Sequence, residues 1–431
     1  MKKKICIVTQ PEVIDTVGGA ITSFICISNL LAENYEVCGV CYSPKNGNPP
    51  SLSDNVKFVN LYNYYENTFS FSSAINSFIG NYKPDLIMFF FPYLYVQAQL
   101  LEKYNSIPRI LLFRSRPDIY FAVNKNTEQL ENLYTNTISQ ILFPSYFALL
   151  PEYIKKDNKV VCIPNPTKKS IKFIDSNIEK KKIIYLSRID CWKGHEFLIK
   201  SFALIALKYK DWEIDIYGQS QPLELQEKLT KLVKSLKLEN QIHFCGVTNE
   251  PFETYLKYDF CAFPSYFEGF PNGLSEALSV GLPAVGFKGA SGVNELIIDN
   301  KNGFLTEETY QDFADKIEVL INDKSLRSKF SEEAKNMMKK YDYEQIKSLW
   351  INLVSNVLSG NSLQLNSEFC SAGCEYDLFS IEKLLSMQDC TSLKYNNLFE
   401  RIFSIKTILS NSKYKKVLTI FGIKITFKRK G

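Results

Sequence analysis

Short runs of apolar residues alternate along the chain with longer segments in which apolar residues recur every three or four positions. The first run, Lys4–Thr9, is followed by a helix-like segment, Ile21–Glu33, and by a second apolar run, Tyr35–Tyr42. Runs of four to eight apolar residues are typical of buried strands, and the longer spacing is typical of helices packed on one face. Strands that alternate with helices predict βαβ units and therefore a parallel sheet.

The same alternation continues to residue 166 and begins again after the polar, lysine-rich stretch Thr167–Lys182, which predicts a linker between two domains. Further strands are predicted in the first half at Val56–Asn60, Leu86–Phe91, Arg109–Phe113, Gln140–Phe143 and from Val160. In the second half they are predicted at Ile183–Leu186, Trp212–Tyr217, Ile242–Cys245, Asp259–Pro264 and Pro283–Gly286. Helices are predicted at Gly194–Lys210 and Leu223–Leu236, and from near Asn272 and Val293.

We therefore expect an α/β protein with two doubly wound domains, residues 1–166 and 167–340, that face one another across a cleft. Ligands of such sheets bind at the carboxyl ends of the strands. Residues 341–358 are expected to form a closing helix that packs back toward the first domain. Residues 359–431 form a basic C-terminal extension, of which 360–400 show little pattern.

The composition, 45% apolar and 23% charged, is that of an ordinary globular protein. The eleven cysteines are odd in number and form no ladder of pairs, and the first residues lack the apolar core of a signal peptide. These features predict reduced thiols in the cytoplasm. Cys38 and Cys41 have the spacing of a metal or redox pair but lie in a strand-like run, so we interpret them as core residues. No apolar run reaches the roughly 18 residues that span a bilayer.

The net charge of +5 comes from the tail. Residues 401–431 hold nine Lys or Arg and no Asp or Glu, which leaves a net charge of −4 for the first 400 residues. One interpretation is contact with an anionic membrane surface, where each basic residue adds about 1 kcal/mol. The alternatives are a small strand that pairs with the body and an unstructured basic end. Nucleic-acid binding is not expected, because no aromatic and basic platform recurs in the body.

Two glutamates, Glu268 and Glu276, enclose the run Gly269–Gly273, which leads into a predicted helix. Backbone N–H groups at a helix start are unpaired and favour an anion such as phosphate. A nucleoside-diphosphate sugar could place its diphosphate there and its hydroxyls against the carboxylates. On spacing alone, the alternative is a surface loop with two solvated glutamates.

Two cations, Arg188 and Lys193, follow the predicted strand Ile183–Leu186. Fixed cations at a strand exit can hold a diphosphate and neutralise the charge that grows on it as a bond to it breaks. Either residue alone would be read as an ordinary surface cation. The glycine-rich turns Gly18-Gly19 and Gly289–Gly292 are weak signals by themselves.

Taken together, these motifs resemble glycosyltransferase family 4. The resemblance covers about residues 1–358 and is more specific in the second half. Its motifs there are Ser187-Arg188-x4-Lys193-Gly194, Tyr217-Gly218-Gln219, Phe244-Cys-Gly246, Glu268-Gly-Phe-Pro-Asn-x3-Glu276 and Gly303-Phe-Leu. The resemblance implies the GT-B fold, with two Rossmann-like domains, and a retaining hexosyl- or N-acetylhexosaminyltransferase like those that build bacterial surface polysaccharides such as capsule or lipopolysaccharide.

The resemblance also implies a role for each matching residue. The catalytic set is Arg188 and Lys193, which would bind the diphosphate, and Glu268, which would contact the sugar hydroxyls. The donor-binding positions are Gly18, Gly19, Gly246, Phe270, Pro271, Asn272, Gly273 and Glu276, the last toward the ribose. Many family members carry a histidine after the Pro84-Asp85 strand, but residues 88–95 contain none. We expect His195 and His243 to serve in capping or packing.

The chain has no Asp-x-Asp motif in a suitable loop, so we expect metal-independent transfer without a cofactor. The donor would be a UDP-sugar and the acceptor a glycan or lipid-linked sugar. The protein would act by positioning and charge stabilisation, in the cytoplasm or at the inner face of its membrane. Two alternatives stay open: a nucleotide-sugar epimerase of the same fold, and a non-catalytic subunit that binds sugar nucleotides.

Overall fold

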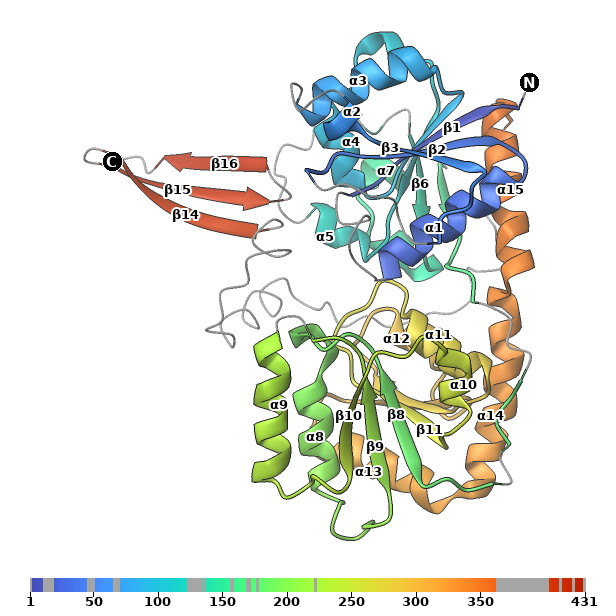
Figure 1. Ribbon diagram of the computed structural model, residues 1–431, viewed down its shortest axis with the longest axis vertical. Helices are drawn as coiled ribbons and strands as arrows, with labels where there is room; N and C mark the ends of the chain where they lie inside the picture. The colour runs from blue at the N-terminus through green and yellow to red at the C-terminus, as the bar shows by residue number, and fades with distance from the viewer. Residues whose placement is uncertain are drawn as a thin grey trace. The chain divides into compact units, whose positions relative to one another are not determined.

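The structure is a computed structural model of the chain (Figure 1). It describes residues 2–10, 19–44, 51–64, 70–121, 134, 137–155, 159–167, 172–175, 178–220 and 223–361, and the backbone of three strands within 403–428. The chain divides into two compact units. The first comprises Met1–Asp118 and Asn126–Leu378, and the second comprises Ile119–Lys125 and Phe379–Gly431.

The first unit contains two parallel sheets, and the N-terminal one has seven strands in the order β3-β2-β1-β4-β5-β6-β7. Its strands are β1 (Lys4–Val8), β2 (Glu36–Cys41), β3 (Val56–Asn60), β4 (Leu86–Phe89), β5 (Arg109–Leu112), β6 (Thr137–Ile141) and β7 (Val160–Cys162). Its helical segments are α1 (Gly19–Ala32), α2 (Leu61–Tyr64), α3 (Phe71–Tyr82), α4 (Pro92–Ala98), η2 (Glu102–Tyr104), α5 (Pro117–Phe121), η3 (Pro144–Leu149) and α7 (Glu152–Lys155). The strand order reverses between β1 and β4, so the sheet is doubly wound.

The second sheet has six strands in the order β10-β9-β8-β11-β12-β13 and reverses between β8 and β11. Its strands are β8 (Lys182–Leu186), β9 (Glu213–Tyr217), β10 (Ile242–Gly246), β11 (Phe260–Phe263), β12 (Ala284–Phe287) and β13 (Gly303–Thr306). Its helical segments are η4 (Cys191–Lys193), α8 (His195–Ala203), α9 (Leu223–Ser235), α10 (Pro251–Tyr255), α11 (Asn272–Ser279), α12 (Val293–Leu296), α13 (Tyr310–Asn322), α14 (Lys324–Met338) and η5 (Lys339–Tyr341). The two sheets confirm the predicted α/β architecture with two doubly wound domains.

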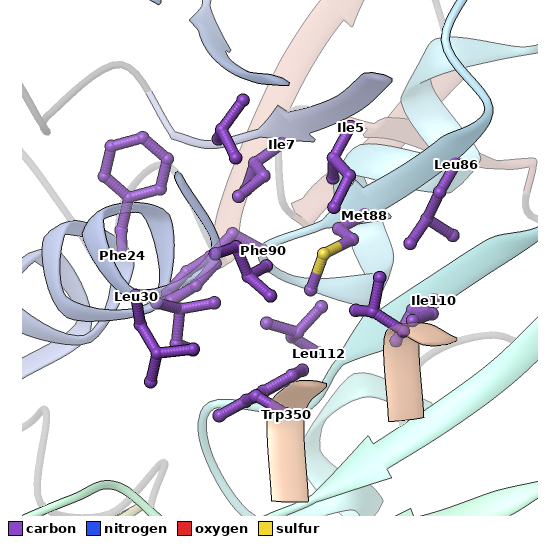
Figure 2. Close-up of a cluster of buried hydrophobic side chains, with 14 of the residues drawn as sticks. Ile5, Ile7, Phe24, Leu30, Leu86, Met88, Phe90, Ile110, Leu112 and Trp350 are labelled. Carbon is purple, nitrogen blue, oxygen red and sulfur yellow. The ribbon is translucent and has the colours of Figure 1, made fainter. Parts of the chain in front are cut away.

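The last helix of the first unit, α15 (Tyr343–Leu358), returns to the N-terminal sheet. Its residues Ile346, Trp350 and Val354 are fully buried in one apolar cluster with Ile5 and Phe24. Figure 2 shows Trp350 among the side chains of this cluster, close to Leu112. The core of the N-terminal sheet is therefore completed by residues that come after the second sheet in the chain.

Two predicted elements differ from the observed ones. Strand β6 is Thr137–Ile141 and not Gln140–Phe143. The polar residues of this strand led to the wrong bounds. Gln140 is nevertheless fully buried, because its side-chain amide donates to the carbonyls of Ile141 and Ile163. Helix α8 ends at Ala203 and not at Lys210, and Leu207 in the turn that follows is 85% exposed.

The second unit contains a three-stranded antiparallel sheet of β14 (Phe403–Ser410), β15 (Lys413–Ile420) and β16 (Ile423–Lys428). Phe403 pairs with Ile420 and Ile420 with Ile423. The basic tail therefore contains strands that pair with one another. Most of the weakly patterned stretch 360–400 lies outside the described residues. Among the helices in the described part of the chain, none has the length and apolar character needed to cross a membrane.

Candidate functional site

The carboxyl ends of β8, β9 and β10 meet at one edge of the second sheet. The N–H of Ser187 donates to the carbonyl of Tyr217 (3.0 Å), and the N–H of Gly218 donates to that of Gly246 (2.7 Å). Gly218 has a φ of 150°, and a Cβ there would lie 1.8 Å from the carbonyl oxygen of Ser187. Only glycine allows this close approach, which brings Gly246 and the segment that carries Arg188 to the same edge.

Lys193 lies in a turn whose backbone is fixed from several sides. The Asp190 side chain caps this turn by accepting a hydrogen bond from the N–H of Trp192 (3.0 Å). The hydroxyl of Tyr185 donates to the carbonyl of Lys193 (2.5 Å). Gly194 follows with a φ of 65°, and a Cβ there would lie 2.1 Å from the carbonyl oxygen of Pro264. The sequence Lys193-Gly194 therefore lets the turn lie directly against the segment after β11.

The side chains of Lys193 and Glu268 form an ion pair, with Nζ and Oε1 2.5 Å apart. They are only 14% and 10% exposed. A buried charge is costly unless it is paired, so each residue explains how the other can be buried. The structure thus brings together two residues, 75 positions apart, that belong to separate motifs in the sequence.

Arg188 differs from Lys193 in its exposure. Its side chain is 44% exposed, and its Nη2 lies 3.4 Å from Oδ2 of Asp190. An ion pair of this length and exposure contributes little free energy. Arg188 can therefore exchange this contact for another anion at low cost.

Helix α11 begins at Asn272 with no side chain capping its first N–H groups. Such groups, together with the helix dipole, favour an anion. A Cβ on Gly273 would lie 2.6 Å from the carbonyl oxygen of Leu186, and the hydroxyl of Tyr255 donates to the Gly273 carbonyl (2.8 Å). Glycine at this position therefore lets the start of the helix lie against the end of β8, next to the segment that holds Arg188.

The other predicted donor-binding positions on this loop and helix have distinct surroundings. Glu276 is half-buried, one turn inside α11. Its charge is the second cause, after burial, of the raised pKa of Tyr255. The side chain of Phe270 is buried, with its ring against that of Tyr341 at 5.7 Å between centroids. Pro271 is the residue before the helix. Because Phe270 packs inward, a ligand contact from it would have to come from its backbone.

Asn272 connects the helix start to the N-terminal half. Its Oδ1 accepts a hydrogen bond from Nδ2 of Asn165 (3.1 Å). A Cβ on Gly19, the first residue of α1, would lie 3.4 Å from Nδ2 of Asn272. Gly18 lies outside the described residues. The sequence motifs do not include Asn165, and its place between Pro164 and Pro166 was the one signal that it has a fixed position.

The two histidines have roles different from those of Lys193 and Glu268. His195 is buried and packs on the ring of Tyr185, with 4.8 Å between ring centroids. Burial and then the charge of Lys193 lower the pKa of His195 to about 3, so the ring is neutral at pH 7. Its helix is capped by Gly194, so His195 has a packing role.

His243 belongs to the one group of described residues that could hold a metal ion, with Glu213 and Asp215. Their ligand atoms lie within 4.8 Å of one another. The ammonium group of Lys182 already lies 2.9 Å from Glu213 and 3.5 Å from Asp215. Because this cation already pairs with both carboxylates, we assign no metal to the group.

Cys38 and Cys41, which have the spacing of a metal or redox pair, are fully buried in the N-terminal sheet. Cys38 on β2 lies opposite Cys6 on β1, and both side chains are fully buried. Burial raises the pKa of Cys38 to about 12. A thiol in that state is a poor nucleophile and metal ligand, in agreement with its interpretation as a core residue.

Residues 166–337 match the family model described as "Glycosyl transferases group 1". This region includes Arg188, Lys193, Glu268 and all of α11.

Two curated relatives illustrate the sequence similarity. One is the N-acetylgalactosamine-N,N'-diacetylbacillosaminyl-diphospho-undecaprenol 4-alpha-N-acetylgalactosaminyltransferase of Campylobacter jejuni, 31% identical over 40% of this chain and 46% of that protein. The other is the poly(glycerol-phosphate) alpha-glucosyltransferase of Bacillus subtilis, 27% identical over 56% of this chain and 40% of that protein. The chain thus spans about half or less of the length of these relatives.

Among solved structures, the HepE protein of Anabaena, determined in complex with UDP and glucose, covers 82% of this chain and 100% of its own with a TM-score of 0.65 and 18% identity. At this level of identity the similarity concerns the fold. The chain therefore has the two-domain GT-B fold, and its residues 166–337 are similar to the group 1 glycosyl transferases.

Proposed function

We propose that the protein is a glycosyltransferase that moves a sugar from a nucleotide-sugar donor to a glycan or lipid-linked acceptor. The observation that carries this proposal is the buried ion pair of Lys193 and Glu268 beside the uncapped start of α11. A cation for phosphate, unpaired amides for phosphate and a carboxylate for sugar hydroxyls lie at one edge of the sheet. The similarity of residues 166–337 to group 1 glycosyl transferases supports the same function.

Binding of the donor would rearrange this pair. The diphosphate would take the amides of α11 and the cations Lys193 and Arg188, and the carboxylate of Glu268 would turn to the hydroxyls of the sugar. Glu276, one turn further along α11, would bind the ribose. Each charge would keep a partner of opposite sign or a hydrogen-bond donor, so that burial of the site is not opposed by an isolated charge.

In the transfer step, the bond between the anomeric carbon and the phosphate oxygen breaks, and a bond from that carbon to the acceptor oxygen forms. The proton of the acceptor hydroxyl passes to the departing diphosphate. We propose retention of configuration by displacement on the same face, since Glu268 is paired with Lys193 and no second carboxylate is assigned as a nucleophile. Positive charge on Lys193 and Arg188 can stabilise the leaving group, and on this basis we propose that no divalent ion is needed.

The identity of donor and acceptor is proposed from the relatives. The HepE structure contains UDP, which supports a UDP-sugar as donor. The Campylobacter relative acts, by its name, on a diphospho-undecaprenol-linked sugar, and the Bacillus relative on poly(glycerol phosphate). Both support an acceptor of the lipid-linked or surface-polysaccharide kind. The basic tail, residues 401–431, would then serve to hold the enzyme at an anionic inner membrane surface.

The direct test is nucleotide release from a panel of UDP-, GDP- and ADP-sugars by the purified full-length chain, with and without a lipid-linked acceptor. We expect release of UDP from one or a few UDP-sugars and loss of release in Glu268→Ala. The matched control is Glu253→Ala, because Glu253 is an exposed glutamate paired only at the surface with Lys172. If no donor is consumed, or if Glu268→Ala behaves like the control, the proposal is wrong.

A further inference from the structure

A short segment of the N-terminal half, Phe143–Tyr146, contacts the loop that carries Glu268. The ring of Phe143 stacks on that of Phe270, with 5.4 Å between centroids and an interplanar angle of 12°. The hydroxyl of Tyr146 donates to the carbonyls of Glu268 (3.2 Å) and Gly269 (3.0 Å). Two side chains from one segment therefore hold the loop at successive residues.

Tyr146 is well suited to a fixed contact. Its side chain is fully buried, and burial is the main cause that raises its pKa well above the ordinary value. The hydroxyl therefore keeps its proton and remains a donor at every physiological pH. Its ring also packs edge-on against Phe143, with 5.5 Å between centroids, so the direction of the hydroxyl is fixed by packing.

The loop is held equally closely on its other sides. The hydroxyl of Ser291 donates to the same Glu268 carbonyl (3.1 Å), and the N–H of Glu268 donates to the carbonyl of Ser291 (3.1 Å). A Cβ on Gly269 would lie 2.2 Å from the carbonyl oxygen of Arg114. The backbone of Glu268 thus lies between Ser291 of the second sheet's domain and Tyr146 of the first, with little room to shift.

We propose that Tyr146 is a positioning residue for donor transfer: its hydroxyl fixes the backbone of Glu268 and thereby directs the Glu268 carboxylate toward the donor sugar. The inference rests on the proposed function. It assigns a donor-side task to a side chain of the N-terminal half, in addition to the donor-binding positions Gly18 and Gly19 that the family resemblance implies there. Displacement of a reacting group by about 1 Å can cost up to roughly 100-fold in rate, so a single hydroxyl can matter at this distance.

The test is Tyr146→Phe, which removes one oxygen and keeps the packing of the ring. We expect kcat/KM for the UDP-sugar to fall about 10-fold, because the carboxylate loses its direction. The Kd for UDP alone should change less than about 2-fold, because UDP carries no sugar for Glu268 to contact. Ser291→Ala, which removes the other hydroxyl on the same carbonyl, should act in the same direction with a smaller effect.

The matched control is Tyr258→Phe. Tyr258 is also buried, and its hydroxyl donates to Asp215 (2.7 Å) on β9, which is not part of the Glu268 loop. We expect its kcat/KM to stay within about 2-fold of wild type even where its Tm falls as much as that of Tyr146→Phe. In a Glu268→Gln background, Tyr146→Phe should have little further effect, since both changes remove one function.

If the wild type is active, the inference alone is overturned when Tyr146→Phe has wild-type kinetics, or when its affinity for UDP falls as much as its kcat/KM. Additive effects of Tyr146→Phe and Glu268→Gln would also contradict it. An inactive wild type across the donor panel would instead overturn the proposed function and the inference with it.

Discussion

The two sheets of the first unit have the same winding but different side chains where their strands end. Strand β4 of the N-terminal sheet is followed by the buried aromatic Phe90, which belongs to the apolar core. In the second sheet, β8 is followed by Ser187 and Arg188, β9 is followed by Gly218, and β10 ends at Gly246. A glycine at a close backbone contact, as at Gly218, and charges at fixed positions leave few acceptable sequences. An apolar core accepts many, which is why family motifs are sharp in the second half and loose in the first.

From this comparison we expect the largest loss of activity from substitutions at the strand ends of the second sheet. In Lys193→Met, kcat/KM for the donor should fall on the order of 1000-fold, because the variant lacks the cation that we propose stabilises the leaving group. The free energy of unfolding should also fall by about 3 kcal/mol, because the Glu268 carboxylate is left buried and unpaired. Steady-state kinetics and urea unfolding measure the two losses separately.

The double variant Lys193→Met/Glu268→Gln should regain much of the stability and none of the activity, since it leaves no buried charge. Lys172→Met is the matched control: its ion pair with Glu253 is more than half exposed on both sides, and such pairs contribute about 0–1 kcal/mol. Retention of a tenth of wild-type kcat/KM in Lys193→Met would show that the pair is structural only.

A substitution in the apolar core of the N-terminal sheet should lower the stability of the protein and leave its kcat nearly unchanged. Trp350→Ala removes a fully buried side chain from the core and should lower the free energy of unfolding by about 3–5 kcal/mol. At low temperature, where the variant is folded, kcat should stay within about 3-fold of wild type. Leu207→Ala, at an 85% exposed position, should change neither quantity. A Trp350→Ala enzyme that is stable but inactive would break the division between the two sheets.

The smallest effect concerns pH. His195 has a folded-state pKa lowered to about 3 by burial, below the ordinary value of about 6.5. The unfolded chain therefore binds a proton that the folded chain excludes as pH falls below 6.5, and stability decreases by about 2 kcal/mol between pH 7 and pH 5. Urea unfolding at these two pH values should show this loss in wild type and its absence in His195→Gln.

His243→Gln is the control for this measurement, because the His243 side chain is 39% exposed and it is the other histidine of the chain. It should keep the wild-type dependence on pH. If the loss of stability between pH 7 and pH 5 persists in His195→Gln, it comes from carboxylates and not from His195.

Local sequence was sufficient for most strands, and it named Lys193 and Glu268 as candidate site residues. It could not predict that Lys193 and Glu268 pair with one another, because the contact depends on how the turn after β8 lies against the segment after β11. The link between Asn165 and Asn272, 107 positions apart, was missed for the same reason. The family resemblance implied donor contacts from the backbone amides around Phe270; its side chain packs inward on Phe143 and Tyr341, which leaves only its backbone for such a contact.

The missed elements have an equally specific cause. Strand β6 was predicted with the wrong bounds because Gln140 is polar, and the sequence does not show the hydrogen bonds that allow its burial. Helices α13 and α14 were not predicted, although their residues have ordinary amphipathic spacing. Helix α15 was expected to close the unit, and its apolar residues Ile346, Trp350 and Val354 now have a defined place.

The return of α15 to the first sheet also sets an order for events at the ribosome. Strands β1 to β7 are synthesised by residue 162, but the tryptophan that completes their core is residue 350. At about 5–20 residues per second, the nascent N-terminal sheet waits roughly 10–40 s with one apolar face incompletely covered. We expect an N-terminal fragment ending at residue 166 to expose that face and to be captured by chaperones where the whole chain is not.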